Sequence, residues 1–242
     1  MAVKVGSARI DENGHAKDGK AGDQTGKEVS TQNWYKHSKG WRVFRAKNPA
    51  YANLIADDME YACLNKNIGY DQNQRGTLYT VSKPYGFNCK KVKTKCECDC
   101  SSLVRVCCAY AGIMLPNFRT SNEASILLNS GYFMEMKGKM YTNTSDFLLR
   151  GDILVTKSQG HTVIVLDDGA KAHDDLEGKI CVVGNSVNVR EEPKKGSRIL
   201  GIVHKGDLLD CLGIANNNYW YITKYKNQIA YITRKYTEFL PD

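Results

Sequence analysis

The pattern of apolar and polar positions predicts helices in the first half of the chain. Apolar side chains recur at helical spacing over residues 49–65, which begin with a proline suited to a first helical turn. A second helix is predicted over residues 100–110, with Gly112 as its stop. A third is predicted ahead of the segment ASILLNSG, because Thr120 and Glu123 have the spacing of a capping box.

Further along the chain, the period becomes that of β-strands. The segments YFMEM, GDILVT and GHTVIVL follow Gly131, and turn residues separate them. Residues 70–95 are expected to form loop and short strand, and the first thirty residues, rich in Gly, Asp and Lys, to form loop or irregular structure. Helices followed by a run of strands predict an α+β domain with helices packed on an antiparallel sheet.

A second domain is expected near the C-terminus. Short predicted strands are separated there by turns at PKKGS, HKGD, ANNN and KNQ. This pattern is typical of a small all-β barrel. The charged segment HDDLEGK, residues 173–179, is the expected boundary, which gives a first domain of residues 1–175 and a second of residues 180–242.

Composition and charge narrow the class of partner. The 242 residues have the composition of an ordinary globular protein, and the net charge of +8 is spread along the chain. An acidic cell-wall polymer would attract a chain with this positive charge. No nucleic-acid-binding motif accompanies it, so nucleic acid is not an expected partner.

The N-terminal segment lacks the apolar core of a signal peptide. The longest apolar stretch, near residues 103–115, is too short to span a bilayer and contains Arg105. We therefore expect a protein made in the cytoplasm, without membrane insertion, and a monomer as the default oligomeric state. Any action on a cell wall would follow release by another route, such as a holin.

Five of the nine cysteines lie in KCECDCSSLVRVCC, residues 95–108. Without an export signal, a disulfide framework is not expected. Cys100 follows Asp99 and begins a predicted helix, where the helix dipole and free backbone N–H groups lower the pKa of a thiol. Cys107 and Cys108 lie further into that helix, where a buried cysteine packs as a small apolar residue. The pattern favours Cys100 as a nucleophile.

Cys96 and Cys98 leave two alternatives open. With Cys89 they could bind zinc, although structural zinc sites usually space paired thiolates by two to four residues, and here the spacing is one. In an extended segment, Cys96, Cys98 and Cys100 would instead share one face, as a resolving thiol beside the nucleophile requires. The chemistry expected of Cys100 needs no metal and no cofactor.

A cysteine nucleophile needs a base, and His161 is the best placed of five histidines. It opens the strand HTVIVL after Gly160, so we expect it at a sheet edge, facing a helix start. A cysteine at a helix start and a histidine on a later strand is the papain-type arrangement. His173 would lie on the same face as His161 after a three-residue turn and would orient it; after a two-residue turn Asp174 would replace it.

The residues around these side chains resemble a known family. The segment DCSSLV, residues 99–104, resembles the Asp-Cys-Ser-Gly-Leu-Val signature of NlpC-type bacterial cell-wall cysteine peptidases. The segments RGDILV and GHTVIVLDDGAKAH resemble their Gly-Asp strand, His strand and third polar residue. Over residues 80–175 the resemblance implies a papain-like fold, with Cys100 as nucleophile, His161 as base and His173 as its orienting residue.

The flanking segments add two further resemblances. KAGDQTGKEVSTQNWY resembles the leading segment of clostridial phage and prophage endolysins, and we expect Trp34 and Tyr35 in it to line a substrate cleft together with Asp99 and Ser101. The segment from VNVREEP onward is similar to bacterial SH3-like domains, which tether wall hydrolases to peptidoglycan. A binding groove would draw on aromatic residues of that domain, and the alternative is that they fill its small core. The expected wall contacts are Trp220 and Tyr231.

Together these features predict an endolysin that hydrolyses peptidoglycan. The Cys100 thiolate would attack a carbonyl of the stem peptide, and His161 would pass the proton to the leaving amine. One rival is a CHAP-like N-acetylmuramoyl-L-alanine amidase, which shares the Cys–His chemistry. The rival of another class is a non-catalytic cell-wall-binding protein whose cysteine cluster is structural.

Overall fold

The computed structural model describes residues 2–158, 160–172, 178–215 and 219–241. The chain divides into two compact units, residues 1–172 and 173–242. Each unit is described by itself. His173 falls outside the described residues.

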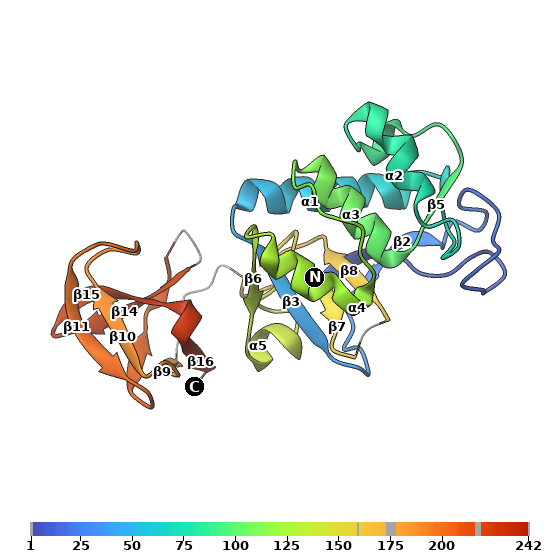
Figure 1. Cartoon of the computed structure of the whole chain (residues 1–242). Helices are drawn as coiled ribbons and strands as arrows, with labels where there is room; N and C mark the ends of the chain where they lie inside the picture. Colours follow the sequence, from blue (N-terminus) through green and yellow to red (C-terminus); the bar gives the residue numbers. More distant parts are fainter. Residues whose placement is uncertain (1, 159, 173–177, 216–218, 242) are drawn as a thin grey trace. The chain divides into compact units, whose positions relative to one another are not determined.

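A six-stranded antiparallel sheet forms the base of the first unit, in the order β2-β1-β8-β7-β3-β6 (Figure 1). The strands are β1 (Lys4–Ala8), β2 (Val29–Asn33), β3 (Trp41–Ala46), β6 (Phe133–Met136), β7 (Ile153–Thr156) and β8 (Thr162–Val165). Strands β7 and β8 form a hairpin at the centre, so the residues that precede β8 lie at one end of the sheet.

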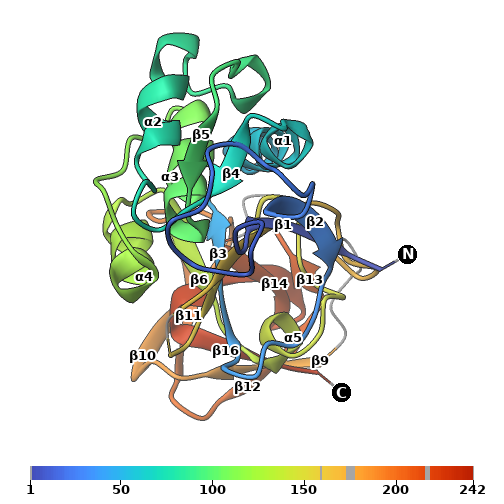
Figure 2. The same ribbon diagram turned by 90° about the vertical axis from the view of Figure 1, so that its right-hand side faces the viewer.

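The helices of the first unit gather mainly over one face of this sheet (Figure 2). They are α1 (Pro49–Leu64), α2 (Thr77–Ser82), α3 (Cys100–Tyr110), α4 (Thr120–Asn129) and the short α5 (Lys139–Thr142), with 3-10 turns at Lys83–Tyr85 and Cys89–Lys91. Helices α1 and α3 pack against each other and against β1 and β8. Apolar side chains such as Ile55, Met59 and Leu103 are fully buried in the core between these elements. No helix among the described residues is long and apolar enough to cross a membrane.

A separate parallel pair of short strands leads into α3. β4 (Ile68–Tyr70) pairs with β5 (Cys96–Cys98), and α3 starts two residues after β5 ends. The position of Cys100 is therefore fixed from both sides, by β5 before it and by the packed helix after it.

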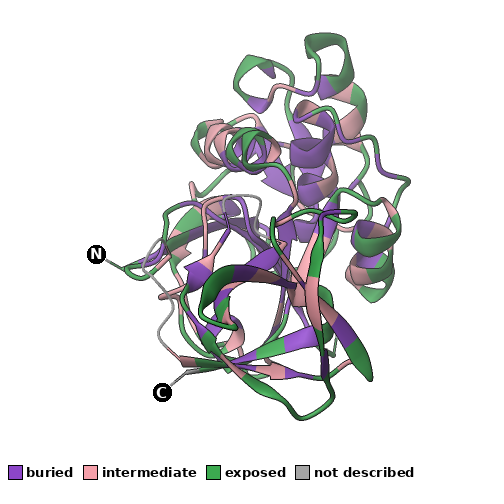
Figure 3. Cartoon of the chain, turned by 90° about the vertical axis from the view of Figure 1, so that its left-hand side faces the viewer, coloured by how far each residue is buried: buried purple, intermediate pink, exposed green. Residues whose placement is uncertain are grey.

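The second unit contains two antiparallel sheets, in the orders β11-β10-β15-β14-β13 and β12-β9-β16. Its strands are β9 (Gly178–Val182), β10 (Ser186–Arg190), β11 (Ile199–His204), β12 (Leu208–Cys211), β13 (Gly213–Ile214), β14 (Trp220–Tyr225), β15 (Gln228–Thr233) and β16 (Thr237–Pro241), with a 3-10 turn at Arg234–Tyr236. Burial alternates along β10, and Figure 3 shows such bands on strands of this unit. One face of each sheet thus encloses a small core.

The predicted fold class is confirmed: an α+β unit precedes an all-β unit. The helices predicted over 49–65 and 100–110 match α1 and α3, and the three predicted strands match β6, β7 and β8. The prediction for residues 70–95 was incomplete, because α2 lies there.

The prediction of loop for the first thirty residues was wrong in part, because β1 lies between β2 and β8 in the main sheet. Its Gly6 suggested a loop. A Cβ at this position would lie 2.6 Å from the Met59 Cγ, so the glycine is there for close packing against α1.

The predicted capping box at Thr120 and Glu123 was also wrong. Helix α4 does begin at Thr120, but the Asn122 side chain accepts the Arg119 backbone N–H, at 2.9 Å. Glu123 is instead fully buried, where its Oε1 accepts a hydrogen bond from the Thr162 hydroxyl at 2.8 Å. This carboxyl group belongs to the interior of the site and not to the helix cap.

Candidate active site

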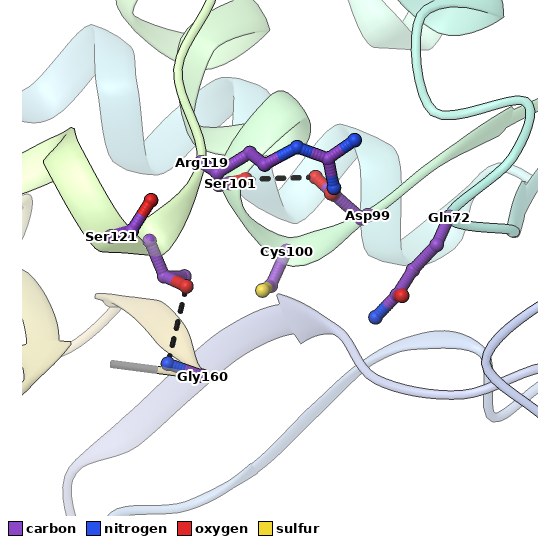
Figure 4. A pocket seen from close by; sticks show the side chains of 8 residues that line it. Gln72, Asp99, Cys100, Ser101, Arg119, Ser121 and Gly160 are labelled. Carbon is purple, nitrogen blue, oxygen red and sulfur yellow. Dashed lines mark hydrogen bonds between the residues drawn. The ribbon is translucent and has the colours of Figure 1, made fainter. Parts of the chain in front are cut away.

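Cys100 is the first residue of α3 and opens into a pocket (Figure 4). The pocket has a volume of about 360 Å³, and the Cys100 side chain projects into it although the residue is only 8% exposed. The lining residues are Gln72, Asp99, Cys100, Ser101, Arg119, Thr120, Ser121 and Gly160. The Gly160 backbone N–H donates to the Thr120 hydroxyl at 3.1 Å, which links the segment before β8 to α4 across the pocket.

The neighbouring cysteines lie in a different environment. All nine cysteines are free thiols, and Cys96, Cys98, Cys107 and Cys108 belong to the hydrophobic core. The Cys98 thiol donates to the Gly69 carbonyl oxygen at 3.4 Å. The described residues contain no group of three or more His, Cys, Asp or Glu side chains arranged to hold a metal ion. Of the five clustered cysteines, Cys100 is the one that lines the pocket.

A buried arginine holds the start of α3 in place. Arg75 forms an ion pair with the Asp99 carboxylate and donates to the Ser101 hydroxyl, at 2.9 Å. Asp99 also caps α3, because its Oδ1 accepts the Ser102 backbone N–H at 2.7 Å while Ser102 Oγ accepts the Asp99 N–H at 2.9 Å. Asp99 and Ser101 were predicted to contact substrate. In this structure their hydrogen bonds are made within the chain.

The start of β8 brings the predicted base to the same place. The backbone N–H groups of Thr162 and Ser101 lie close enough to the Cys100 thiol to lower its pKa. His161 immediately precedes Thr162, and its own backbone N–H donates to the Thr156 hydroxyl at 3.2 Å. The helix start and the histidine-bearing end of β8 therefore meet at the Cys100 sulfur.

Burial changes the acid–base properties of both side chains. It raises the pKa of the Cys100 thiol well above its usual value, and the charges of Asp99 and Glu123 raise it further. The expected lowering at the helix start is outweighed, although the Thr162 and Ser101 N–H groups act in that direction. Burial also lowers the pKa of His161 to about 4, with smaller contributions from His37 and Arg9. At pH 7, thiol and imidazole are both neutral in the protein without substrate.

Aromatic side chains surround His161. The ring centroids of His37 and Trp41 each lie 6.4 Å from that of His161, and Tyr35 lies 5.6 Å from Trp41. The Trp41 indole N–H donates to the Tyr35 carbonyl oxygen at 2.8 Å, which fixes the cluster. Burial raises the pKa of the Tyr35 hydroxyl, and the nearby Cys100 thiol adds to this.

The remaining predicted site residues are not part of this pocket's lining. Trp34 is half-buried next to Tyr35. Trp220 and Tyr231 belong to the second unit, where Trp220 is buried at 9% exposure and Tyr231 is half-buried on β15. His37, Arg75 and Glu123 were not predicted as site residues. No motif or spacing marks them, because the three side chains reach the site only through tertiary packing.

The fold and the site together define a two-part protein with a cysteine-containing pocket on the α+β unit and a separate all-β unit. Residues 5–172 match the family described as Endolysin-like domain, and residues 185–238 match the family described as Bacterial SH3 domain. The chain belongs to the endolysin-like domain family and carries a bacterial SH3 domain at its C-terminal end. A comparison with curated proteins found no match.

Proposed function

We propose that this endolysin hydrolyses an amide bond of the peptidoglycan stem peptide, with Cys100 as nucleophile and His161 as base. The observation that supports this most directly is the position of Cys100 at a helix start, with its side chain lining the pocket. The other four cysteines of the cluster, Cys96, Cys98, Cys107 and Cys108, lie in the hydrophobic core and do not line this pocket.

The raised pKa of Cys100 and the lowered pKa of His161 favour a general-base mechanism over a resting ion pair. Neutral His161 takes the thiol proton as the sulfur attacks the substrate carbonyl carbon. The imidazolium then gives that proton to the leaving amine, and a thioester remains on Cys100. Water, deprotonated by His161, hydrolyses the thioester and regenerates the thiol.

The oxyanion formed on attack needs hydrogen-bond donors. Cys100 occupies the first position of α3, where a backbone N–H has no acceptor within the helix. The Gln72 side chain projects toward the same pocket (Figure 4), and its amide also donates to the Tyr70 hydroxyl at 3.1 Å. We assign these two groups as the oxyanion donors.

The second unit is proposed to hold the enzyme on the wall. A bacterial SH3 domain fits this role, and the net charge of +8 attracts the chain to anionic wall polymers. We propose that the protein acts on the wall after its release from the cytoplasm through a holin.

Substitution of Cys100 tests the catalytic proposal. Cys100→Ala and His161→Gln are each expected to reduce the rate of lysis of purified cell walls by at least about 10³-fold, because each removes a member of one catalytic unit. Circular dichroism checks that the fold is retained. Cys63→Ser, at a half-buried thiol on α1, is the matched control and should leave lysis unchanged. Normal lysis by Cys100→Ala would refute the proposal.

Product analysis identifies the bond that is cut. Mass spectrometry of fragments released from purified peptidoglycan should show a new amino terminus within the stem peptide. A new N-terminal alanine next to intact glycan would instead identify the CHAP-like amidase activity. If no fragment is released and wall binding persists, the protein is a non-catalytic wall-binding protein.

A further inference from the structure

A second pocket opens at the end of the main sheet where β7 turns into β8. Its volume is about 340 Å³, and its lining comes from the start of β3, the end of β6, the short α5 and the residue after β7. The register between β3 and β7 pairs Trp41 with Thr156, so these strand ends lie together. None of its lining residues lines the pocket that contains Cys100, which we call the active-site pocket.

Lysines dominate the charged side chains of this second pocket. Lys137, Lys139 and Lys157 line it and are exposed. Among the ion pairs of the described residues, none includes any of these three lysines. The remaining cation, Arg42, donates two hydrogen bonds to the Glu135 carboxylate, at 2.7 and 3.1 Å, so these two charges neutralise each other. The lysine charges are therefore available to an anionic ligand.

The floor of the second pocket is apolar. Trp41 and Met136 line it although they are only 1% and 2% exposed. The aliphatic stem of Lys157 packs on the chain beside them, because a Cβ at Gly40 would lie 3.3 Å from the Lys157 Cδ. The Lys157 backbone N–H also donates to the Gly40 carbonyl oxygen at 3.0 Å, which fixes this residue in the wall. An apolar floor with ammonium groups around it is complementary to an aliphatic chain that ends in an anion.

The turn between β7 and β8 connects this pocket to the active-site pocket. Lys157 lines the second pocket, and Gly160, three residues later, lines the active-site pocket. A Cβ at Gly160 would lie 3.2 Å from the Lys39 Nζ, so this ammonium group lies at the edge of the active-site pocket. Trp41 lines the second pocket, and its ring centroid is 6.4 Å from that of His161. The two pockets are thus neighbours, with lysine charge on the segment between them.

We propose that the second pocket is a substrate subsite, which binds a free carboxylate of the stem peptide whose amide bond lies at Cys100. This inference rests on the proposed function. Stem peptides carry free carboxylates on aliphatic chains, and such a chain matches both the apolar floor and the lysines. Arg42 is held by Glu135, so the lysine ammonium groups recognise the carboxylate as point charges. A phosphate polymer would use the lysines and leave the apolar floor without a partner.

The test measures binding of a soluble glycan–stem peptide fragment, released from purified peptidoglycan by a glycosidase, to the full chain carrying Cys100→Ala. Isothermal titration should show the Kd rising about tenfold when Lys137→Gln and Lys157→Gln are added, because charge-assisted contacts are lost. Lys91→Gln with Lys93→Gln removes the same charge at exposed positions outside both pockets. This matched control should change the Kd less than about twofold, because screening weakens the attraction of distant charges.

The carboxylate is tested with the same fragment after its carboxylates are converted to primary amides. The amidated fragment should bind the Cys100→Ala chain about tenfold more weakly, and the substitutions at Lys137 and Lys157 should then have no further effect. An unchanged Kd for the unmodified fragment on substitution of these two lysines would overturn the subsite. An equal loss in the control variant would overturn it too, because the attraction would then come from the charge of the whole chain.

Kinetics of the chain with Cys100 intact separate this inference from the proposed function. The substitutions at Lys137 and Lys157 should raise KM about tenfold and leave kcat unchanged, because a contact remote from the reacting bond binds substrate and transition state equally. Normal lysis by Cys100→Ala refutes the proposed function, whereas an unchanged KM in the lysine variant refutes the subsite alone. If this variant binds a poly(glycerol phosphate) chain more weakly but the fragment as tightly as before, the pocket holds an anionic polymer, and the subsite is likewise refuted.

Discussion

Thr162 connects two buried acids at the start of β8. Its backbone N–H lies close enough to Cys100 to lower the pKa of the thiol, and its hydroxyl donates to the Glu123 carboxyl group. Burial raises the pKa of Glu123 to about 8, and a negative charge on Glu123 raises the pKa of Cys100 in turn. The protonation of these two side chains is therefore linked through one residue.

Glu123→Gln should change how stability depends on pH. In the unfolded chain Glu123 ionises near its ordinary pKa of 4.5, whereas in the folded chain it stays protonated up to about pH 8. The folded state holds the extra proton in this window, so the contribution of Glu123 to stability falls as pH rises from 5 to 8. Over this range, urea unfolding should show that the free energy of unfolding of the variant rises relative to that of the wild type by about 1.4 kcal/mol per pH unit.

The Glu135→Gln variant serves as the control, because Glu135 is partly exposed and paired with Arg42. Its stability should stay parallel to that of the wild type across the same pH range. If the stability of Glu123→Gln also stayed parallel to that of the wild type from pH 5 to 8, Glu123 would be ionised in the folded protein, which would contradict the prediction.

The identity of single residues was more predictable than their chemistry. Cys100 and His161 could be proposed from a helix start and a strand start, both of which are local patterns. Their pKa values depend on burial and on Asp99, Glu123 and His37, which sequence spacing does not bring together. The expected thiolate was wrong for the resting state for that reason.

The start of α3 depends on the ion pair between Arg75 and Asp99. Asp99 caps the helix, and the Arg75 guanidinium also donates to Ser101 and to the Phe118 carbonyl oxygen. Both partners are buried. The same carboxylate thus caps the start of α3 and neutralises a buried cation.

Asp99→Asn should destabilise the first unit by about 3–5 kcal/mol, because it leaves the Arg75 charge buried without its partner. Urea unfolding of the single and double variants measures this. Adding Arg75→Met to Asp99→Asn should recover a large part of the loss, since the charge is then absent. The Arg42–Glu135 pair is partly exposed, and breaking it should cost less than about 1 kcal/mol. An Asp99→Asn protein as stable as the wild type would contradict the role given to the ion pair.

Among the helices and strands, those with a clear pattern of apolar residues were predictable, and short ones with few apolar residues were not. Helices α1 and α3 have long apolar stripes, and β7 and β8 have compact apolar runs. β1 is short and contains Gly6, so its place in the sheet comes from pairing on both sides and from packing against Met59. Such pairing partners are distant in sequence and leave no local signal.

The two units have separate interiors, so their stabilities can be measured separately. Calorimetry of the full chain should show two unfolding transitions. Trp220 is buried in the second unit, and Trp220→Ala should destabilise that unit by about 3–5 kcal/mol and leave the other transition in place. Ile229→Ala, at an exposed position on β15, is the control and should move neither transition appreciably. A single cooperative transition lowered by Trp220→Ala would contradict separate interiors.

The buried, protonated state of Cys100 has a consequence for the lifetime of the enzyme. A thiolate is the nucleophile that attacks peroxides and disulfides, and a thiol with a raised pKa is almost entirely protonated. The other clustered cysteines are enclosed in the core, beyond the reach of such oxidants. A protonated Cys100 is therefore slow to be oxidised while no substrate is bound, and in the proposed mechanism its sulfur becomes reactive only when His161 takes the proton.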